Sequence, residues 1–192
     1  MTIEKLQHLC QTARSLFGTE ELIIAGGAPR DTLSGVQVKD IDIFVRIEWE
    51  EGEDTQFTHN CKILAAWLMG EAEFRPANED YGNLLDLCDI KGANAHGLIQ
   101  VIGLDRDPIG DVHSYDFGLS QVFVTPSGLF YTENAVKDRA NKTITHFATY
   151  ENDAGFLRSK ARYGRLLEKY AGWRFVNCEA LEGDSMPVEI PF

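Results

Sequence analysis

The sequence has 192 residues, of which 44% are hydrophobic and 25% are charged, and its formal net charge is −12 at pH 7. This composition excludes a disordered chain and is typical of a soluble globular domain, alone or with a small appendage. The acidic balance excludes a protein that attracts nucleic acid over its whole surface, so any contact with RNA is expected to be local or metal-mediated. No apolar stretch approaches the roughly 18 residues of a membrane span, and residues 1–22 carry several charges, so no signal peptide or membrane partner is expected. A cytoplasmic location follows as the expectation.

The cysteines and histidines carry no metal signature. The four cysteines lie far apart, and none of the five histidines has another at the i, i+4 spacing. Neither a disulfide framework nor a zinc site is therefore expected.

Hydrophobic periodicity and turn residues predict the elements of the first two thirds of the chain. In chain order they are a helix over 2–17, a strand over 21–25, a short helix from 29 to 34, a strand over 40–47, an acidic loop over 48–54, a helix over 56–69, strands over 84–90 and 98–104, and a hairpin of 117–125 with 129–131.

The last third of the chain has a different pattern. Helices are expected over 134–140 and 153–170, with an extended piece over 142–147 between them and a loop over 179–192. The pattern predicts an α+β fold, with a small mixed β-sheet flanked by helices and a short C-terminal helical extension. We expect residues 1–132 to form the core, and residues 133–192 the helical extension and an irregular tail.

The strand expected at Asp40-Ile41-Asp42-Ile43 carries two carboxylates one residue apart. Because side chains alternate along a strand, both aspartates share one face, with α-carbons about 6.5–7 Å apart. Two carboxylates so placed can converge on divalent cations, as in two-metal phosphoryl-transfer sites. The simpler interpretation is a solvated edge strand, where this pattern needs no special explanation.

A second motif, Gly26-Gly27-Ala28-Pro29-Arg30-Asp31, precedes this strand. Glycines between a strand and a helix let the backbone approach a ligand closely, and a helix start favours phosphate. The alternative is an ordinary helix-entry turn with a surface Arg–Asp pair.

Together, Gly26-Gly27-x-x-Arg30-Asp31 and Asp40-x-Asp42 resemble the head-domain signature of the DNA polymerase β-like nucleotidyltransferase superfamily. They are most similar to the class II tRNA nucleotidyltransferases (CCA-adding enzymes) and bacterial poly(A) polymerases. Residues 115–117 are similar to the R-R-D-F strand of that branch, although Ser114 and Tyr115 stand where arginines are expected. Residues 157–163 resemble its arginine helix. Compact versions of this kind also look typical of phage-encoded members.

The resemblance implies a role for each matching residue. Asp40 and Asp42 would bind two Mg²⁺ ions and act as the catalytic carboxylates. The phosphates of a nucleoside triphosphate would be held by Gly26, Gly27 and Arg30, with Asp31 supporting the site.

Three further residues are candidates, each with a plainer alternative. Asp116 would be a third acidic residue near the metals, or else a structural aspartate at the start of a strand. Arg158 and Arg162 would reach the nucleotide or the acceptor, or else belong to a solvated helix face.

The implied function is metal-dependent transfer of a nucleoside monophosphate from a nucleoside triphosphate to a hydroxyl, with an RNA 3′ end as the leading acceptor. A protein hydroxyl or a small molecule stays open as the acceptor. One alternative is a nucleotide-binding or regulatory protein on the same fold without turnover, because the two arginines are missing. Another is an interaction protein that acts through its acidic surface. The sequence leaves the oligomeric state open.

Overall fold

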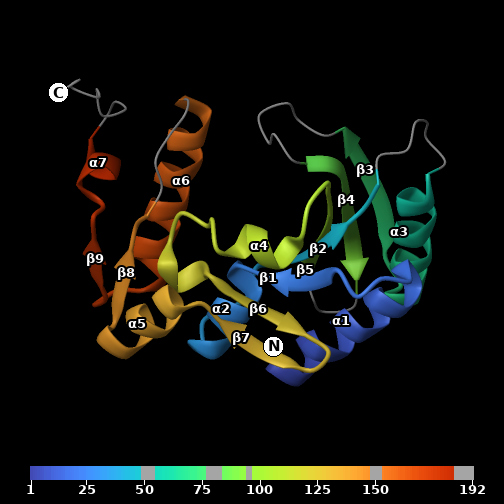
Figure 1. Ribbon diagram of the computed structural model, residues 1–192, viewed down its shortest axis with the longest axis horizontal. Helices are drawn as coiled ribbons and strands as arrows, with labels where there is room; N and C mark the ends of the chain where they lie inside the picture. The colour runs from blue at the N-terminus through green and yellow to red at the C-terminus, as the bar shows by residue number, and fades with distance from the viewer. Residues whose placement is uncertain (49–54, 77–83, 94–96, 148–152, 184–192) are drawn as a thin grey trace.

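The computed structural model describes residues 1–48, 55–76, 84–93, 97–147 and 153–183 (Figure 1). The elements in chain order are α1 (Ile3–Phe17), β1 (Leu22–Ala25), α2 (Gly27–Leu33), β2 (Asp40–Arg46), α3 (Gln56–Trp67), β3 (Glu71–Pro76), β4 (Leu84–Ala93), β5 (Gly97–Leu104), α4 (Pro108–Val112), the 3₁₀ helix η2 (Gly118–Ser120), β6 (Val122–Thr125), β7 (Gly128–Tyr131), α5 (Glu133–Asn141), β8 (Thr143–Thr145), α6 (Asp153–Lys169), β9 (Arg174–Val176) and α7 (Glu179–Glu182).

A seven-stranded mixed sheet organises the fold, in the order β3-β4-β5-β2-β1-β6-β7. β2 lies at its centre, parallel to β5 and antiparallel to β1. A separate pair of short parallel strands, β8 and β9, lies beside α5 and α6 (Figure 1). The mixed sheet flanked by helices is the predicted fold class.

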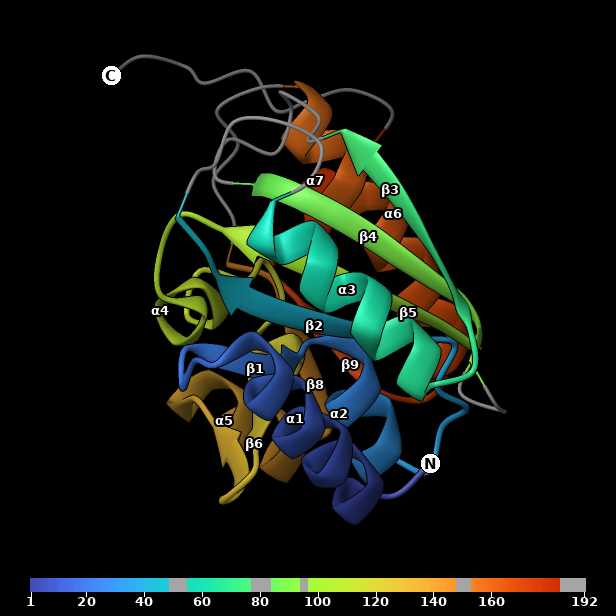
Figure 2. The same cartoon turned by 90° about the vertical axis from the view of Figure 1, so that its right-hand side faces the viewer.

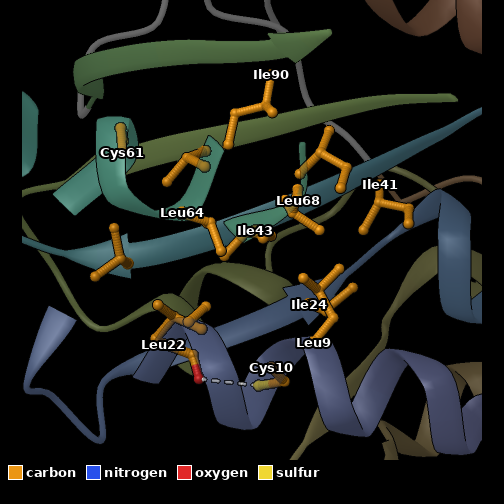
Figure 3. Close-up of a cluster of buried hydrophobic side chains, with 14 of the residues drawn as sticks. Leu9, Cys10, Leu22, Ile24, Ile41, Ile43, Cys61, Leu64, Leu68 and Ile90 are labelled. Carbon is orange, nitrogen blue, oxygen red and sulfur yellow. Dashed lines mark hydrogen bonds between the residues drawn. The ribbon is translucent and has the colours of Figure 1, made fainter. Parts of the chain in front are cut away.

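The principal core lies between the sheet and the helices α1 and α3, which cover one face of it (Figure 2). Ile41 and Ile43 of β2 have no exposed surface, and Figure 3 shows them facing Leu9 of α1 and Leu64 of α3. Each such buried side chain contributes about 1.5–3 kcal/mol of hydrophobic stabilisation. This burial fixes which face of β2 is left for its polar residues.

The long helix α6 lies on the other side of the sheet, behind the strands in Figure 2. A second hydrophobic cluster holds it, in which Phe156, Tyr163 and Leu166 of α6 join Phe117 and Ile144. All five are buried, so α6 is packed on the body of the protein along its apolar side. The charged residues of α6 lie on its other side, away from this hydrophobic cluster.

Several sequence-based expectations were wrong or incomplete. β3, α4 and β9 were not predicted, and residues 179–182 form α7 where a loop was expected. β3 gives a weak signal because it is a short edge strand with only two apolar side chains before Pro76, Ala72 and Phe74, and it pairs only with β4.

The strand expected over 117–125 is a strand only from Val122 onward, because residues 118–120 form η2. Gly118 sits so tightly that an added β-carbon would lie 2.7 Å from Oδ2 of Asp138. The acidic loop and most of the tail lie outside the described residues, and the division of the chain near residue 132 stays a prediction.

All four cysteines are buried and free. Within the described ranges, no helix combines the length and the apolar composition that crossing a membrane requires.

Candidate active site

The pairing of β1 with β2 brings the two sequence motifs together. Ala25, the last residue of β1, is the register partner of Asp42. Gly26 and Gly27 follow directly, so their turn lies beside the Asp40 end of β2. An ideal β-carbon on Gly27 would be 3.9 Å from Oδ1 of Asp40. The glycine turn and the carboxylate strand therefore border one space.

Asp40 and Asp42 project from the face of β2 opposite the principal core. Both are half-buried, while Ile41, Ile43 and Val45 between and after them are fully buried. Because β2 has a strand on each side, it is not the solvated edge strand of the simpler interpretation. Two neighbouring half-buried carboxylates on one face repel each other, and a cation between them would relieve that repulsion.

A cavity of about 400 Å³ opens over this face of the sheet. The side chains around it come from the glycine turn and α2, β2, β5, residues 115–120 and α6. They are Gly26, Gly27, Arg30, Lys39, Asp40, Asp42, Phe44, Gln100, Tyr115, Asp116, Ser120, Arg162, Arg165, Leu166 and Lys169. Five are cationic and three are carboxylates, so the cavity has a local positive excess in a protein of net charge −12. Such a pocket attracts an anionic ligand that the rest of the surface repels.

The glycine turn leaves room beside Arg30. Gly26 has φ +73°, a backbone conformation that residues with a β-carbon rarely adopt. A β-carbon on Gly27 would lie 3.7 Å from Nη2 of Arg30 and 3.9 Å from Oδ1 of Asp40. The absent side chain at Gly27 therefore leaves space between the guanidinium of Arg30 and the carboxylate of Asp40.

Arg30 is held rigidly by its other two nitrogens. Its Nε donates to Oδ1 of Asp31 at 2.7 Å, and its Nη1 donates to the Ser120 hydroxyl at 2.8 Å. The guanidinium also lies 5.7 Å from the centre of the Tyr170 ring. These contacts pre-orient Nη2 toward the glycine turn.

Asp31 is almost completely buried and does not line the cavity. Besides Arg30, it accepts hydrogen bonds from the Tyr170 hydroxyl at 2.9 Å and from the ammonium of Lys169. Burial opposes the ionisation of Asp31, but the charges of Arg30 and Lys169 outweigh it and lower the pKa of this carboxyl. Asp31 therefore ties α2 to the end of α6 as an ionised carboxylate.

Asp116 forms a second tie to α6. Its Oδ2 accepts hydrogen bonds of 2.6 Å from both the Ser159 hydroxyl and Nη1 of Arg162. The residue is buried and borders the cavity, at a point before η2 rather than at the start of a strand. Arg158, one turn earlier on α6, does not line the cavity.

The environment of Asp42 disfavours a bare negative charge. Burial and the neighbouring carboxylate of Asp40 raise the pKa of Asp42 to about 7. A bound divalent cation would act in the opposite direction and stabilise the ionised form. This is the behaviour expected of a metal ligand in a metal-free protein, although buried acid pairs also arise elsewhere.

The donor set fits Mg²⁺ only with help from a substrate. Across the described ranges, no group of three or more His, Cys, Asp or Glu side chains is placed to hold a metal ion. Mg²⁺ is commonly held by one or two carboxylates together with substrate phosphates and water. Asp40 and Asp42 fit that arrangement.

Tyr115 stands where the resemblance leads one to expect an arginine. Burial, together with Asp111 and Asp42, raises the pKa of its hydroxyl well above the usual value, so the side chain is neutral. Within the described residues this hydroxyl has no hydrogen-bond partner. The ring packs on Phe44 with a centroid separation of 6.2 Å, so an aromatic wall replaces a charge at this end of the cavity.

Besides Tyr115, the polar cavity residues that the sequence analysis does not name as site candidates are Lys39, Gln100, Ser120, Arg165 and Lys169. Arg162, Arg165 and Lys169 recur at helical spacing on one side of α6, which is a signal the sequence does contain. No sequence pattern marks Gln100 as a site residue, because only the pairing of β5 with β2 places it beside Asp42.

Comparison with known proteins supports the fold. No protein-family model matches the sequence, and no curated protein matches it either. Among solved structures, the chain is similar to the Thermotoga maritima CCA-adding enzyme complexed with tRNA, with 19% identity and a TM-score of 0.58 over 94% of this chain and 44% of that one.

Two further structures give the same result. An apo tRNA-processing enzyme has 20% identity and a TM-score of 0.57 over 91% of this chain and 43% of its own. A CCA-adding enzyme with ATP has 18% identity and a TM-score of 0.53 over 86% of this chain and 38% of its own.

The protein thus has the nucleotidyltransferase head fold that the sequence motifs led us to expect. The chain spans less than half the length of these structural neighbours.

Proposed function

We propose that the protein is a metal-dependent nucleotidyltransferase. It transfers a nucleoside monophosphate from a nucleoside triphosphate to a hydroxyl and releases pyrophosphate. The observation that carries this proposal is the single cavity bordered by Asp40, Asp42, the glycine turn and the cations of α2 and α6. Carboxylates for divalent cations and cations for phosphate are the two requirements of phosphoryl transfer.

Two bound Mg²⁺ ions would activate the attacking hydroxyl and neutralise charge on the leaving pyrophosphate. Asp40 and Asp42 would hold them from one face of β2. Arg30 would bind phosphate oxygens through Nη2, which lies beside Gly27. Arg165 and Lys169 of α6, which also line the cavity, would add positive charge.

The reaction needs little covalent chemistry from the protein. The acceptor oxygen gives its proton to solvent water and bonds to the α-phosphorus, while the bond from that phosphorus to the bridging oxygen breaks and pyrophosphate leaves with its electron pair. The protein's contribution is to hold the reacting groups in line and to stabilise the developing charge. Both tasks need the rigid cation placement that Asp31 and Asp116 provide.

The proposed acceptor is an RNA 3′ end. The structural neighbours include a CCA-adding enzyme complexed with tRNA and another with ATP. The net charge of −12 restricts RNA contact to the cationic cavity and its rim. A short single-stranded end fits that restriction better than a long duplex.

One observation favours the alternative of a nucleotide-binding protein without turnover. Tyr115 is neutral at a position where the family resemblance leads one to expect arginine, so one phosphate-binding charge is absent. Arg162, Arg165 and Lys169 of α6 supply positive charge to the same cavity in place of the missing arginine. Catalysis is therefore the leading proposal.

Incubation with each labelled nucleoside triphosphate, Mg²⁺ and total RNA tests the proposal, with the Asp42→Asn variant as control. Label in RNA that depends on Mg²⁺ and Asp42 supports it. Nucleotide binding without incorporation into RNA supports the alternative. The absence of both nucleotide binding and transfer would refute both candidate functions.

A further inference from the structure

Gln100 occupies a defined place between two carboxylates. It lies on β5, where its register partner on one side is Asp42 of β2 and on the other is Asp89 of β4. It also lines the cavity. Partners in register share a face of the sheet, so the side chains of Asp42, Gln100 and Asp89 follow one another across the same face.

The orientation of this amide follows from chemistry. Nε2 of Gln100 donates to Oδ1 of Asp89 at 2.8 Å, and Nη2 of Arg75 donates to the same oxygen at 2.7 Å. An ionised carboxylate can only accept hydrogen bonds, so the amide must present its nitrogen to Asp89. With the nitrogen bound to Asp89, the amide oxygen is the group of Gln100 that can turn to the cavity, which Asp40 and Asp42 also line.

Asp40 and Asp42 leave coordination positions of a divalent cation unfilled, and an amide oxygen at Gln100 would fill one of them. Throughout the described part of the chain, no three His, Cys, Asp or Glu side chains form a metal-binding group. Divalent hard cations accept amide carbonyl oxygens as well as carboxylates. An uncharged ligand beside Asp40 and Asp42 would add to cation binding without adding to the repulsion between those two residues.

We propose that the amide oxygen of Gln100 is a third protein ligand, joining Asp40 and Asp42 around a divalent cation, and that Asp89 holds the amide in the required orientation. The inference rests on the proposed function, because it needs the cation that Asp40 and Asp42 would bind. It adds a residue that the sequence motifs do not contain.

The test is the affinity of the protein for Mn²⁺ alone, measured by electron paramagnetic resonance without nucleotide. Gln100→Leu keeps the side-chain volume and removes both amide groups, so Mn²⁺ should bind on the order of tenfold more weakly. Gln11→Leu, on the exposed side of α1, is the matched control and should bind as the wild type does.

A second variant separates a ligand from a structural residue. Gln100→Glu keeps an oxygen facing the cavity but loses the donor to Asp89. It should therefore retain Mn²⁺ affinity within about threefold of wild type, or exceed it, despite a lower melting temperature. Should Gln100→Leu fail to fold, Gln100→Ala removes the same oxygen.

Each outcome bears on a specific claim. Equal loss of Mn²⁺ in the Leu and Glu variants would mean that Gln100 acts only through Asp89, which overturns the inference. Wild-type affinity in Gln100→Leu, together with loss in Asp42→Asn, would overturn it while leaving the proposed function intact. Failure of the wild type to bind Mn²⁺ without nucleotide would overturn the inference, whereas the proposed function would still be decided by the transfer assay, because substrate phosphates can complete the metal site.

Discussion

Nη1 of Arg162 lies 2.6 Å from Oδ2 of Asp116, an oxygen that also accepts a 2.6 Å hydrogen bond from the Ser159 hydroxyl. Both donors belong to α6, and Asp116 is buried. The sequence marks Asp116 as a possible third metal-site carboxylate, whereas these hydrogen bonds join it to α6. Its geometry is that of a positioning residue, which holds the cationic side of α6 over Asp40 and Asp42.

Asp116→Asn should therefore weaken nucleotide binding more than metal binding. The amide oxygen can accept both hydrogen bonds but carries no charge opposite Arg162, so we expect about 1–2 kcal/mol of lost stability and a several-fold weaker affinity for nucleoside triphosphate. The Mn²⁺ affinity should change by less than about threefold, because only a distant charge is lost. Calorimetric titration with nucleotide and Mn²⁺ separately checks both. A loss of Mn²⁺ affinity as large as that in Asp42→Asn would instead make Asp116 a metal ligand.

Gly27→Ala should impair nucleotide binding without unfolding the protein. The added β-carbon would meet Arg30 and Asp40 at 3.7 and 3.9 Å, which are ordinary contact distances, yet it would fill the gap between them. We expect an affinity for nucleoside triphosphate at least about tenfold lower, with a melting temperature near that of the wild type. Gly164→Ala is the control, because nothing lies within 4 Å of its added β-carbon. That helical substitution should raise stability by roughly 0.5–1 kcal/mol and leave binding unchanged.

Asp42→Asn should abolish Mg²⁺-dependent transfer and yet stabilise the metal-free protein at pH 8. The pKa of Asp42 is raised to about 7, mainly by burial and then by Asp40. A raised pKa means that the folded state holds its proton more tightly, so this contribution to stability is present at pH 4 and is lost as the pH rises through 7. The neutral amide of the Asp42→Asn variant does not ionise, so the variant keeps this contribution to stability at high pH. We expect its free energy of unfolding to exceed that of the wild type by an amount on the order of 1–3 kcal/mol at pH 8, and the difference to disappear near pH 4.

Urea unfolding at both pH values, with a chelator present, measures this difference. Adding Mg²⁺ should stabilise the wild type and leave Asp42→Asn unaffected. An Asn variant that is less stable than the wild type at pH 8 without metal would contradict the proposed environment of Asp42.

Asp31→Asn should be strongly destabilising. The buried carboxylate accepts hydrogen bonds from Arg30, Lys169 and Tyr170, and its loss leaves the half-buried Arg30 without its counter-charge. We expect a cost of about 3–5 kcal/mol at pH 7. Because the pKa of Asp31 is lowered, its contribution is present above its usual pKa of 3.8 and is lost as the pH falls below that value. The difference between variant and wild type should therefore shrink below pH 4, as measured by urea unfolding across this range.

The sequence by itself determined the two short motifs and most of the longer elements, but not β3, α4, β9 or α7. Alternation in Asp40-Ile41-Asp42-Ile43 predicts both aspartates on one face and the isoleucines on the other, which the burial of Ile41 and Ile43 confirms. Glycines after a short apolar strand likewise predicted the turn at Gly26 and Gly27. Such features depend on neighbours within a few positions along the chain, where periodicity and backbone preference act.

Tertiary structure alone decided what surrounds those motifs. The central place of β2, the orientation of Gln100 by Asp89, and the ties from Asp31 and Asp116 to α6 all join residues more than ten positions apart. Their partners are selected by strand register and by the packing of Phe156 and Leu166 of α6, which no local pattern encodes. For the same reason, Arg165 and Lys169 read along the chain as helix charges, and only the folded protein brings them to the cavity wall.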